Sequence, residues 1–282
     1  MWLLESSNRI VFSVAGSGNQ AMSRNFELLY QVGRAEALLG SDANPGSVSS
    51  SSDLEPSAVY PAEIPVTTPA LQIDGLVREE MTKLVHRLFL LSSTDGPRQV
   101  VFAGMELGDG CTWICAHAAE ILASQVRGSV CVVDCNLRFP ALHRQFGTEN
   151  HYGLSDALLS DGPIREYARP LSRPNLWLLT CGGLSANAEE FLASDRMRRR
   201  LSELRAEFRY VLMDVGPVNT CNHAMVLGGL TDGIVLVLKA HASRRDSARQ
   251  TIQQLHALKV RMLGAVLNQR TFPIPERVYK RL

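Results

Sequence analysis

The chain has 282 residues, of which 45% are hydrophobic and 20% charged, values that are ordinary for a soluble globular protein. Its 29 basic and 28 acidic residues leave a net charge of +1, so there is no electrostatic case for binding nucleic acid or a membrane surface. Apolar runs such as 234–238 are far shorter than the ~18 residues of a membrane span, and no basic segment followed by an apolar core suggests a signal peptide. We therefore expect a cytoplasmic protein.

The first 74 residues differ in pattern from the rest of the chain. Residues 1–21 show no clear pattern, and the segment that begins at Met22 is more typical of the start of a protein than the segment that begins at Met1. We therefore expect residues 1–21 to be an extension. Apolar residues at roughly helical spacing predict a short helix over about 24–39. A Ser- and Pro-rich stretch then has too few large apolar residues to offset the entropy of ordering it. The expected parts are an N-terminal segment (1–40), a disordered linker (41–74) and an α/β domain (75–282).

From residue 75 onward the pattern alternates between helical and strand-like runs. An apolar face opposite a charged one predicts a helix over 76–90. The predicted strands are 99–103, 129–134, 175–180, 210–214, 233–238 and 262–267. The further predicted helices are about 112–126, 154–159, 188–192, 195–208 and 244–258. Several strands are near-continuous apolar runs, which indicates a mainly parallel, doubly wound α/β sheet with helices on both faces. In such sheets ligands bind at the carboxyl ends of the strands.

A glycine-rich loop follows the first strand of this domain and leads into a helix. Gly108 and Gly110 would let the backbone approach an anion without Cβ clashes. Backbone N–H groups would then cradle phosphates, and they come from Gly108, Asp109, Gly110, Cys111 and Thr112. The Thr112 hydroxyl lies where Mg²⁺ could bind. Phosphate loops of this kind carry Lys just before that Thr, and here the residue is Cys111. The loop is therefore a stronger candidate for phosphate binding than for catalysis.

Polar residues end three of the predicted strands. Asp134 and Asp214 would bring two carboxylates beside the glycine-rich loop, the arrangement that holds and orients Mg²⁺ on a nucleotide. Either Asp by itself would equally suit a helix N-cap or a turn. The side-chain amide of Asn268 could form hydrogen bonds with the edge of a nucleotide base. The alternative interpretation is that Asn268 is an ordinary turn residue.

The six cysteines are interpreted first as free thiols in a reducing compartment. A metal site is disfavoured because the cysteine ligands of zinc sites are usually spaced more closely in the sequence and lie on loops. Cys111, at a helix N-terminus, could alternatively be a redox switch, since a thiol there has a lowered pKa. The six positions are Cys111, Cys115, Cys131, Cys135, Cys181 and Cys221.

Taken in order, these motifs resemble the cytoplasmic kinase domain of the bacterial tyrosine kinases that control capsule and exopolysaccharide export, which belong to the MinD/ParA-like P-loop ATPases. The resemblance covers about 76–271. Gly108-Asp-Gly-Cys-Thr112 is similar to Walker A, G-x-G-K-T, except at Cys111. The segment from Val132 to Gly147 looks like the family's second acidic motif, V-D-x-D-x-R-x-P, with Asn136 in place of its second acid. Tyr210-Val-Leu-Met-Asp214 looks like Walker B, and Leu263 to Asn268 like the strand whose Asn contacts adenine.

The resemblance implies ATP and Mg²⁺ as cofactors. Asp134 would act near the transferred phosphate or acceptor hydroxyl, and Asp214 would act through the metal together with Thr112. Asn268 would hold adenine. Arg138 is a candidate to compensate for the missing lysine.

The resemblance further implies an ATP-dependent protein-tyrosine kinase that regulates capsule or exopolysaccharide biosynthesis or export. Tyr279 would be the phosphoacceptor, unless it is a structural terminal tyrosine. Because Cys111 and Asn136 each remove one charge, the alternative is a catalytically silent, nucleotide-binding regulatory subunit of an export complex. A third hypothesis is a positioning ATPase of the MinD/ParA type.

The resemblance also implies partners. A polysaccharide-export membrane protein would be one, and would recruit the cytoplasmic chain to the inner membrane. A second copy of the chain would be another, through the helix over 76–90. There Glu80-Met-Thr-Lys83 is the nearest match to the family's E-x-x-R segment.

Overall fold

The computed structural model describes residues 10–15, 75–91, 96–183, 191–240 and 242–270. The predicted helix over 24–39, the predicted linker 41–74 and Tyr279 lie outside these residues. So does most of the predicted helix over 188–192.

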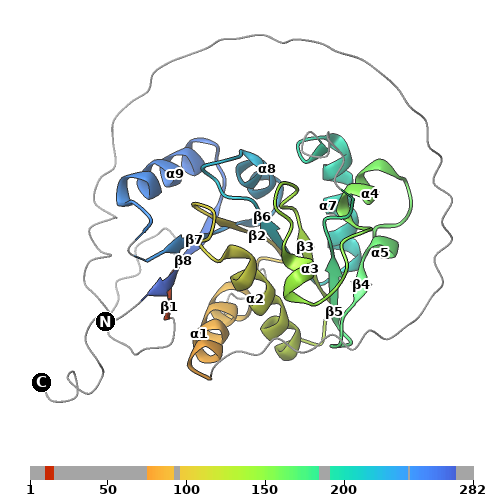
Figure 1. Cartoon of the computed structure of the whole chain (residues 1–282), viewed down its shortest axis with the longest axis horizontal. Helices are drawn as coiled ribbons and strands as arrows, with labels where there is room; N and C mark the ends of the chain where they lie inside the picture. The colour runs from red at the N-terminus through yellow and green to blue at the C-terminus, as the bar shows by residue number, and fades with distance from the viewer. Residues whose placement is uncertain (1–9, 16–74, 92–95, 184–190, 241, 271–282) are drawn as a thin grey trace, which may run out of the picture. The chain divides into compact units, whose positions relative to one another are not determined.

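A mainly parallel β-sheet forms the centre of the described domain, as predicted (Figure 1). The strands lie in the order β1-β8-β7-β2-β6-β3-β5-β4, and every neighbouring pair is parallel except β5 with β4. Their bounds are Ile10–Ala15 (β1), Gln99–Gly104 (β2), Val130–Asp134 (β3), Arg169–Pro170 (β4), Leu176–Leu179 (β5), Tyr210–Val215 (β6), Gly233–Lys239 (β7) and Met262–Arg270 (β8). Six of these match the six predicted strands to within three residues at either end.

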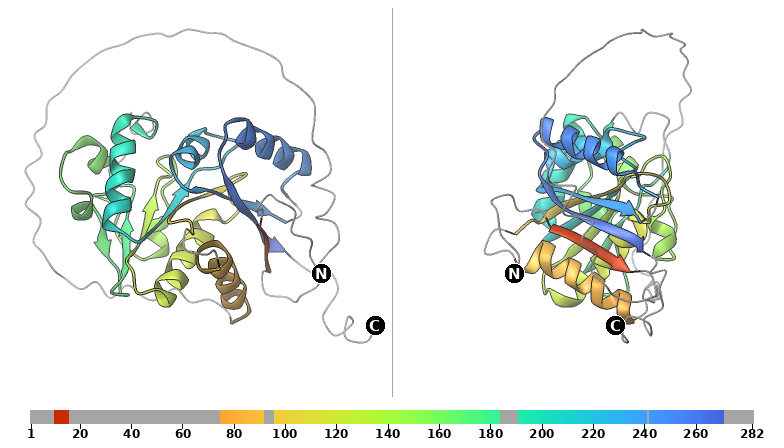
Figure 2. Two further views of the ribbon diagram at one scale, coloured as in Figure 1. Left: turned by 180° about the vertical axis from the view of Figure 1, so that it is seen from behind. Right: turned by 90° about the vertical axis from the view of Figure 1, so that its left-hand side faces the viewer.

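Helices cover both faces of the sheet. Their bounds are Gly75–Val85 (α1), Cys111–Gln125 (α2), Leu142–Gln145 (α3), Leu154–Leu159 (α4), Ile164–Tyr167 (α5), Asp195–Glu207 (α7), His223–Leu230 (α8) and Arg245–Ala257 (α9), with a π-helical turn η2 (His86–Leu90) directly after α1. The connection through α2 runs from β2 to β3, toward the β4 edge of the sheet. The connections through α7 (β5 to β6), α8 (β6 to β7) and α9 (β7 to β8) run toward the β1 edge. Right-handed crossovers therefore place α2, with α1, on one face and α7 to α9 on the opposite face (Figures 1 and 2).

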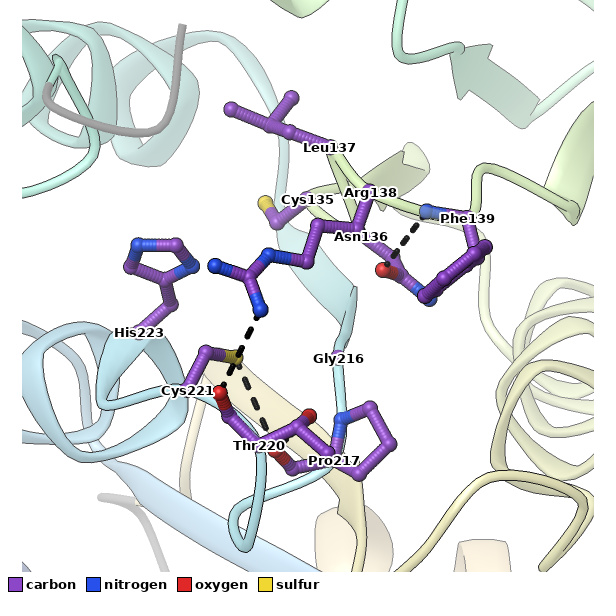
Figure 3. Close-up of a pocket in the computed structure, with 10 residues that line it drawn as sticks. All are labelled: Cys135, Asn136, Leu137, Arg138, Phe139, Gly216, Pro217, Thr220, Cys221 and His223. Atoms are coloured by element: carbon purple, nitrogen blue, oxygen red, sulfur yellow. Dashed lines mark hydrogen bonds between the residues drawn. The ribbon is translucent and has the colours of Figure 1, made fainter.

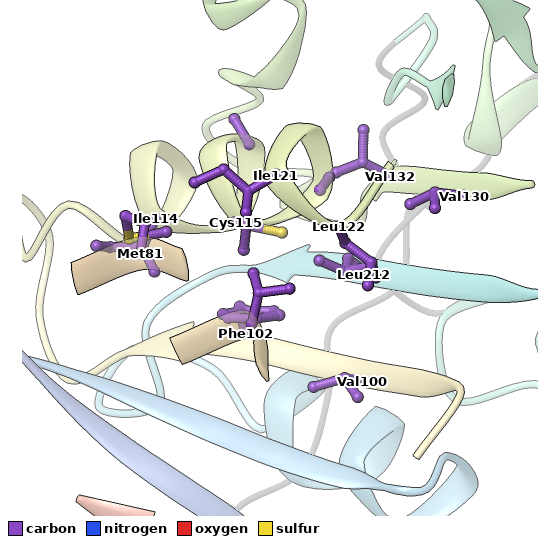
Figure 4. Close-up of a cluster of buried hydrophobic side chains, with 14 of the residues drawn as sticks. Met81, Val100, Phe102, Ile114, Cys115, Ile121, Leu122, Val130, Val132 and Leu212 are labelled. Atoms are coloured by element: carbon purple, nitrogen blue, oxygen red, sulfur yellow. The ribbon is translucent and has the colours of Figure 1, made fainter. Parts of the chain in front are cut away.

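A large apolar cluster lies between α2 and the sheet (Figure 4). Phe102 of β2 and Leu212 of β6 project toward Ile114 and Leu122 of α2, and all four side chains are fully buried. Met81 of α1 extends the same cluster. Burial of such side chains contributes about 1.5–3 kcal/mol each, so this cluster holds α2 and the loop before it in place.

Five elements of the structure were not predicted, namely β1, β4, α3, α5 and α8. β1 lies within residues 1–21 and pairs in parallel with β8 at the edge of the sheet, where Ile10 is opposite Gly264 (Figure 2). α8 was missed because Gly228 and Gly229 are poor helix formers. A Cβ on Gly228 would lie 2.8 Å from Val260 Cγ1, so the glycine allows a close approach that outweighs local helix propensity. Among the described residues, no helix is both long and apolar enough to cross a membrane.

Candidate functional site

The glycine loop, defined here as residues 105–110, joins β2 to α2. Gly108 and Gly110 have φ values of 87° and 81°, a left-handed conformation that favours glycine. The buried Asp109 carboxylate braces the loop, since its Oδ2 accepts hydrogen bonds from the N–H groups of Met105 at 2.9 Å and Glu106 at 2.8 Å. Asp109 can therefore contribute its backbone to a ligand, while its side chain keeps the loop in shape.

The first turn of α2 offers backbone N–H groups at the end of this loop. Gly110 is the N-cap residue and has no side chain to accept a hydrogen bond from that turn. Free N–H groups and the positive end of the helix dipole together favour an anion such as phosphate. The geometry suits the phosphate-binding role that the sequence predicts for residues 108–112.

Asn268, near the end of β8, lies against the glycine loop. Its Nδ2 donates to the Asp109 carbonyl oxygen at 2.8 Å, and its Oδ1 accepts from the Gln269 N–H at 2.8 Å. A Cβ on Gly110 would lie only 2.3 Å from the same Nδ2. Both ends of the Asn268 amide are thus engaged in holding the loop, and the adenine contact that the resemblance implies stays a prediction.

Substituting Ala for Gly110 is expected to destabilise the protein more than the same change at Gly108. Both positions have positive φ, so each change should cost about 1 kcal/mol in backbone strain. Only the new Cβ at Gly110 meets Asn268, whereas nothing lies within 4 Å of a Cβ at Gly108. Urea unfolding of the two variants measures the difference. Equal losses of stability would contradict the close contact between Asn268 and Gly110.

Asp134, at the end of β3, organises the loop that follows it. Its Oδ1 accepts from the N–H of Asn136 at 3.1 Å, and its Oδ2 accepts from the N–H groups of Ala141 and Leu142 at 3.0 Å each. Burial raises the pKa of Asp134 to about 6, although these three hydrogen bonds act to lower it. The sequence predicts a catalytic carboxylate at this position, and in the structure its oxygens hold the backbone of residues 136–142.

Replacing Asp134 with Ala is expected to destabilise the protein by about 2–4 kcal/mol, because one buried and two partly buried N–H groups lose their acceptor. The matched control is Asp161→Ala, since the Asp161 side chain is 89% exposed and should change stability by less than about 0.5 kcal/mol. The free energy of unfolding in urea measures both. A small effect at Asp134 would show that the loop holds itself in place.

Asp214, on β6, is a buried carboxylate near the carboxyl end of its strand. It is paired in register with Asp134 on the neighbouring strand, and it is fully buried. Neither oxygen completes a hydrogen bond within the described residues. Burial and the charge of Asp134 raise the pKa of Asp214 to about 8, while the side chains of Thr112 and Cys111, which face it, act in the opposite direction.

The arrangement around Asp214 fits a divalent cation on a nucleotide. An orphaned buried carboxylate beside the Thr112 hydroxyl is the donor set that such an ion uses, with phosphate oxygens completing its coordination. Among the described residues, no three His, Cys, Asp or Glu side chains gather closely enough to hold a metal ion by themselves. Any cation here would therefore depend on further ligands.

Cys111 is the first residue of α2, and its partly exposed side chain faces Asp214. Burial, followed by the charge of Asp214, raises the pKa of the Cys111 thiol well above its usual value. The redox-switch hypothesis required a lowered pKa, and it is wrong on this point. Burial of the thiol and the negative charge of Asp214 together outweigh the lowering of the pKa that a helix N-terminus provides.

A small cleft separates the loop after β3 from the loop after β6 (Figure 3). Arg138 extends across it from the first loop, and its Nη1 donates to the Thr220 carbonyl oxygen at 3.5 Å. Asn136 accepts a hydrogen bond from the Phe139 N–H at 3.3 Å through its Oδ1. The cleft also contains three residues that the sequence interpretation did not assign to the site. Extending the motif nine residues beyond Asp214, rather than stopping at the strand end, would have included them: Thr220, Cys221 and His223.

In α1, Lys83 is engaged within its own helix. Its Nζ lies 2.8 Å from Oε1 of both Glu79 and Glu80, and these partners raise its pKa. The E-x-x-R-like segment is therefore internally paired in this structure, and its role in self-association stays a prediction.

Comparison with known proteins decides the family. Tyrosine-protein kinase YwqD of Bacillus subtilis is 30% identical over 161 residues, which are 57% of this chain and 68% of that protein. The chain belongs to the bacterial tyrosine-protein kinases. No protein-family model matches it. Another relative, the putative tyrosine-protein kinase EpsB of Ralstonia nicotianae, is 28% identical over 190 residues, which are 67% of this chain and 25% of EpsB.

Solved structures agree on this fold. The chimerical protein CapA2B2 superposes with a TM-score of 0.65 at 23% identity, over 71% of this chain and 87% of that one. The septum site-determining protein MinD of Pyrococcus horikoshii, solved with Mg-ADP, superposes with a TM-score of 0.51 at 18% identity, over 60% of this chain and 69% of that one. The predicted MinD/ParA-like P-loop fold is confirmed. The chain spans only about a quarter of the length of relatives such as EpsB.

Proposed function

We propose that residues 75–282 form the nucleotide-binding domain of an ATP-dependent protein-tyrosine kinase of the capsule and exopolysaccharide type. The observation that carries the proposal is the fully buried Asp214, which lies beside Thr112 and the glycine loop and whose oxygens have no hydrogen-bond partner among the described residues. The names of the relatives support the reaction, since YwqD and EpsB are both described as tyrosine-protein kinases, the latter as a putative one.

In this proposal ATP supplies the phosphoryl group, and Mg²⁺ offsets the charge that develops during its transfer to a tyrosine hydroxyl. The N–H groups of residues 108–112 hold phosphate oxygens, and Thr112 with Asp214 holds the cation. Asp134 is a positioning residue, because both of its oxygens hold the loop that carries Arg138. Arg138 stabilises negative charge from across the cleft. Asn268 keeps the glycine loop in position, with the adenine contact as its second proposed role.

Two substitutions each remove one charged group from this site, one positive and one negative. Cys111 takes the position of the Walker A lysine, and Asn136 that of the second acid. Single cationic contacts to a transferred phosphoryl group matter by orders of magnitude, so we infer weak turnover. The specific observation behind the alternative function, a silent regulatory subunit, is that Cys111 occupies the lysine position while the Asp214 oxygens have no hydrogen-bond partner among the described residues.

Calorimetry of ATP binding with and without Mg²⁺ tests the proposed function, followed by detection of phosphotyrosine after incubation with labelled ATP. Mg²⁺-dependent binding with slow incorporation is expected, and substitution of Asp214 by Asn should abolish both. Binding without any turnover would favour the silent subunit. The absence of nucleotide binding would overturn both functions.

The finer assignments belong to the same proposal. A polysaccharide-export membrane protein is the proposed partner, and it would bring the cytoplasmic chain to the inner membrane. Self-association through 76–90 and phosphorylation of Tyr279 are proposed on the family resemblance. The third hypothesis, a positioning ATPase, shares the fold but has no observation that favours it, since the segment from Arg138 to Gly147 resembles the kinases.

A further inference from the structure

A row of arginines lies along the amino ends of the parallel strands, at the edge of the sheet opposite the glycine loop. Six parallel strands are neighbours in the order β8-β7-β2-β6-β3-β5, so their amino ends share that edge. Asp232 precedes β7, and its carboxylate is paired with Arg205 at 3.0 Å. An arginine lies within the three residues before each of the other five strands, and in the same strand order these are Arg261, Arg98, Arg209, Arg127 and Arg173.

Most of these arginines are not used by the fold. The exception is Arg98, whose Nε donates to the Arg209 carbonyl oxygen at 2.9 Å. The side chains of Arg127, Arg209 and Arg261 are exposed, and within the described residues their guanidinium groups form no ion pair and no hydrogen bond. These three cations are therefore accessible to a ligand.

Helix dipoles explain only part of the row. Each of α2, α7 and α9 connects parallel strands and so ends at this edge, and a basic residue follows its last residue by two positions. These residues are Arg127, Arg209 and Lys259. A positive charge there offsets the negative end of a helix dipole. A side chain that capped the helix would also donate to its last carbonyl groups, which none of the three does among the described residues.

The edge has an excess of positive charge. The carboxylates of Asp232 and Glu207 lie at this edge, and each is already paired, with Arg205 at 3.0 Å and with Arg165 at 3.3 Å. The net charge of +1 for the whole chain does not reveal this local excess. The expectation that the chain has no electrostatic case for a membrane surface considered only that sum.

The dimensions of the row indicate the kind of partner. Neighbouring strands lie about 4.8 Å apart, so the five intervals from β8 to β5 spread the row over roughly 24 Å. A row of that length on an open sheet edge suits a broad anionic surface better than a single small ligand. Leu258, 59% exposed, lies directly before Lys259, and an apolar side chain among basic ones is typical of contact with lipid headgroups and acyl chains.

We propose that this edge binds an anionic phospholipid surface. The basic edge is defined by the partly or fully exposed residues Arg127, Arg173, Arg209, Lys259 and Arg261. Because the glycine loop lies at the opposite edge of the sheet, a chain bound in this way keeps its nucleotide site directed away from the lipid. The inference goes beyond the proposed function and does not depend on it.

Sedimentation of the full chain with lipid vesicles tests the inference. Vesicles of phosphatidylcholine with about 30% phosphatidylglycerol should bind the chain, and vesicles of phosphatidylcholine alone should not. Raising the salt concentration from about 0.1 M to about 0.5 M should release the chain, because screening shortens the range of the attraction. Failure of the wild type to bind the anionic vesicles at the lower salt concentration would overturn the inference.

Charge-removing variants locate the contact. The edge variant should partition onto the anionic vesicles about a hundredfold more weakly than the wild type, and it replaces Arg127, Arg209 and Arg261 together with Gln. The single variants Arg127→Gln and Arg261→Gln should each weaken binding by about fivefold. The matched control variant removes the same charge from exposed positions away from the basic edge, and it replaces Arg199, Arg244 and Arg245 with Gln.

The control variant should bind the vesicles almost as well as the wild type, and urea unfolding should be unchanged in both triple variants. Equal weakening in the two triple variants would show that net charge alone decides binding, and would overturn the inference. Wild-type binding by the edge variant would do the same. A poly-glutamate peptide is the second probe, and binding of this peptide without binding of vesicles would overturn the lipid partner in favour of an acidic protein segment.

Discussion

Substituting lysine for Cys111 is expected to raise phosphotyrosine formation by about two to three orders of magnitude, the size of effect that single charged groups have on transferring phosphoryl groups. Nucleotide affinity should rise as well, because an ammonium group at the start of α2 would add a positive charge where the phosphates bind. The same lysine would give Asp214 an ion-pair partner in the free protein. Incorporation of label from ATP into tyrosine, compared with the wild type, measures the effect.

The control for this variant is Cys111→Gln, which has a long polar side chain without charge. If lysine and glutamine change activity equally, the effect comes from side-chain size and the missing cation is not what limits the reaction. Failure of the lysine variant to gain activity would direct attention to Asn136, whose replacement by Asp restores the second acid of the motif. Nucleotide binding without turnover in all of these variants would favour the silent regulatory subunit.

Asp214→Asn is expected to stabilise the free protein at alkaline pH while abolishing nucleotide binding that depends on a metal ion. Burial and Asp134 raise the pKa of Asp214 from 3.8 to about 8 in the folded protein. The folded state therefore holds this proton more tightly than the unfolded chain does. The resulting stabilisation is fully present below pH 3.8 and is lost as the pH rises toward 8, where an ionised carboxylate is buried without a partner.

Urea unfolding at about pH 5 and about pH 8.5 tests this sign. The wild type should lose stability between the two values, and Asp214→Asn should lose less, so that the variant is the more stable protein at the higher pH by about 1–3 kcal/mol. Asp161→Asn is the control, because that carboxylate is exposed and should keep the wild-type slope. An identical pH slope in Asp214→Asn would show that the carboxylate titrates normally. A stabilising change that removes function is typical of residues kept for binding.

The sheet was largely predictable because its strands carry their own signal. Strands buried on both faces need continuous apolar runs, and these runs lie in the sequence where β2, β3, β5, β6, β7 and β8 lie in the structure. β1 has a similar apolar run, but a single strand at an edge has no alternating pattern around it, and its place depends on pairing with β8. The short helices α3 and α5 and the glycine-containing α8 are set by contacts rather than by propensity.

For the site, the sequence by itself determined which residues meet. Chain direction brings the carboxyl ends of parallel strands to one edge, so the glycine loop, Asp134 and Asp214 had to lie together. Only the tertiary structure decided how each group is used. The Asp134 oxygens accept hydrogen bonds from backbone N–H groups of the following loop, while those of Asp214, on the neighbouring strand, have no hydrogen-bond partner in the part of the chain that the structure describes.

The glycine loop likewise has some features that the sequence determines and others that only the tertiary structure decides. Its glycines and the Cys111 in place of lysine are plain in the sequence, and they predicted phosphate binding with reduced catalytic charge. That Asn268 clamps the loop, and that the Cys111 thiol faces a buried carboxylate and has a raised pKa, follow from burial and from contacts between distant segments. Desolvation and distance set these properties, and both arise only when the chain is folded.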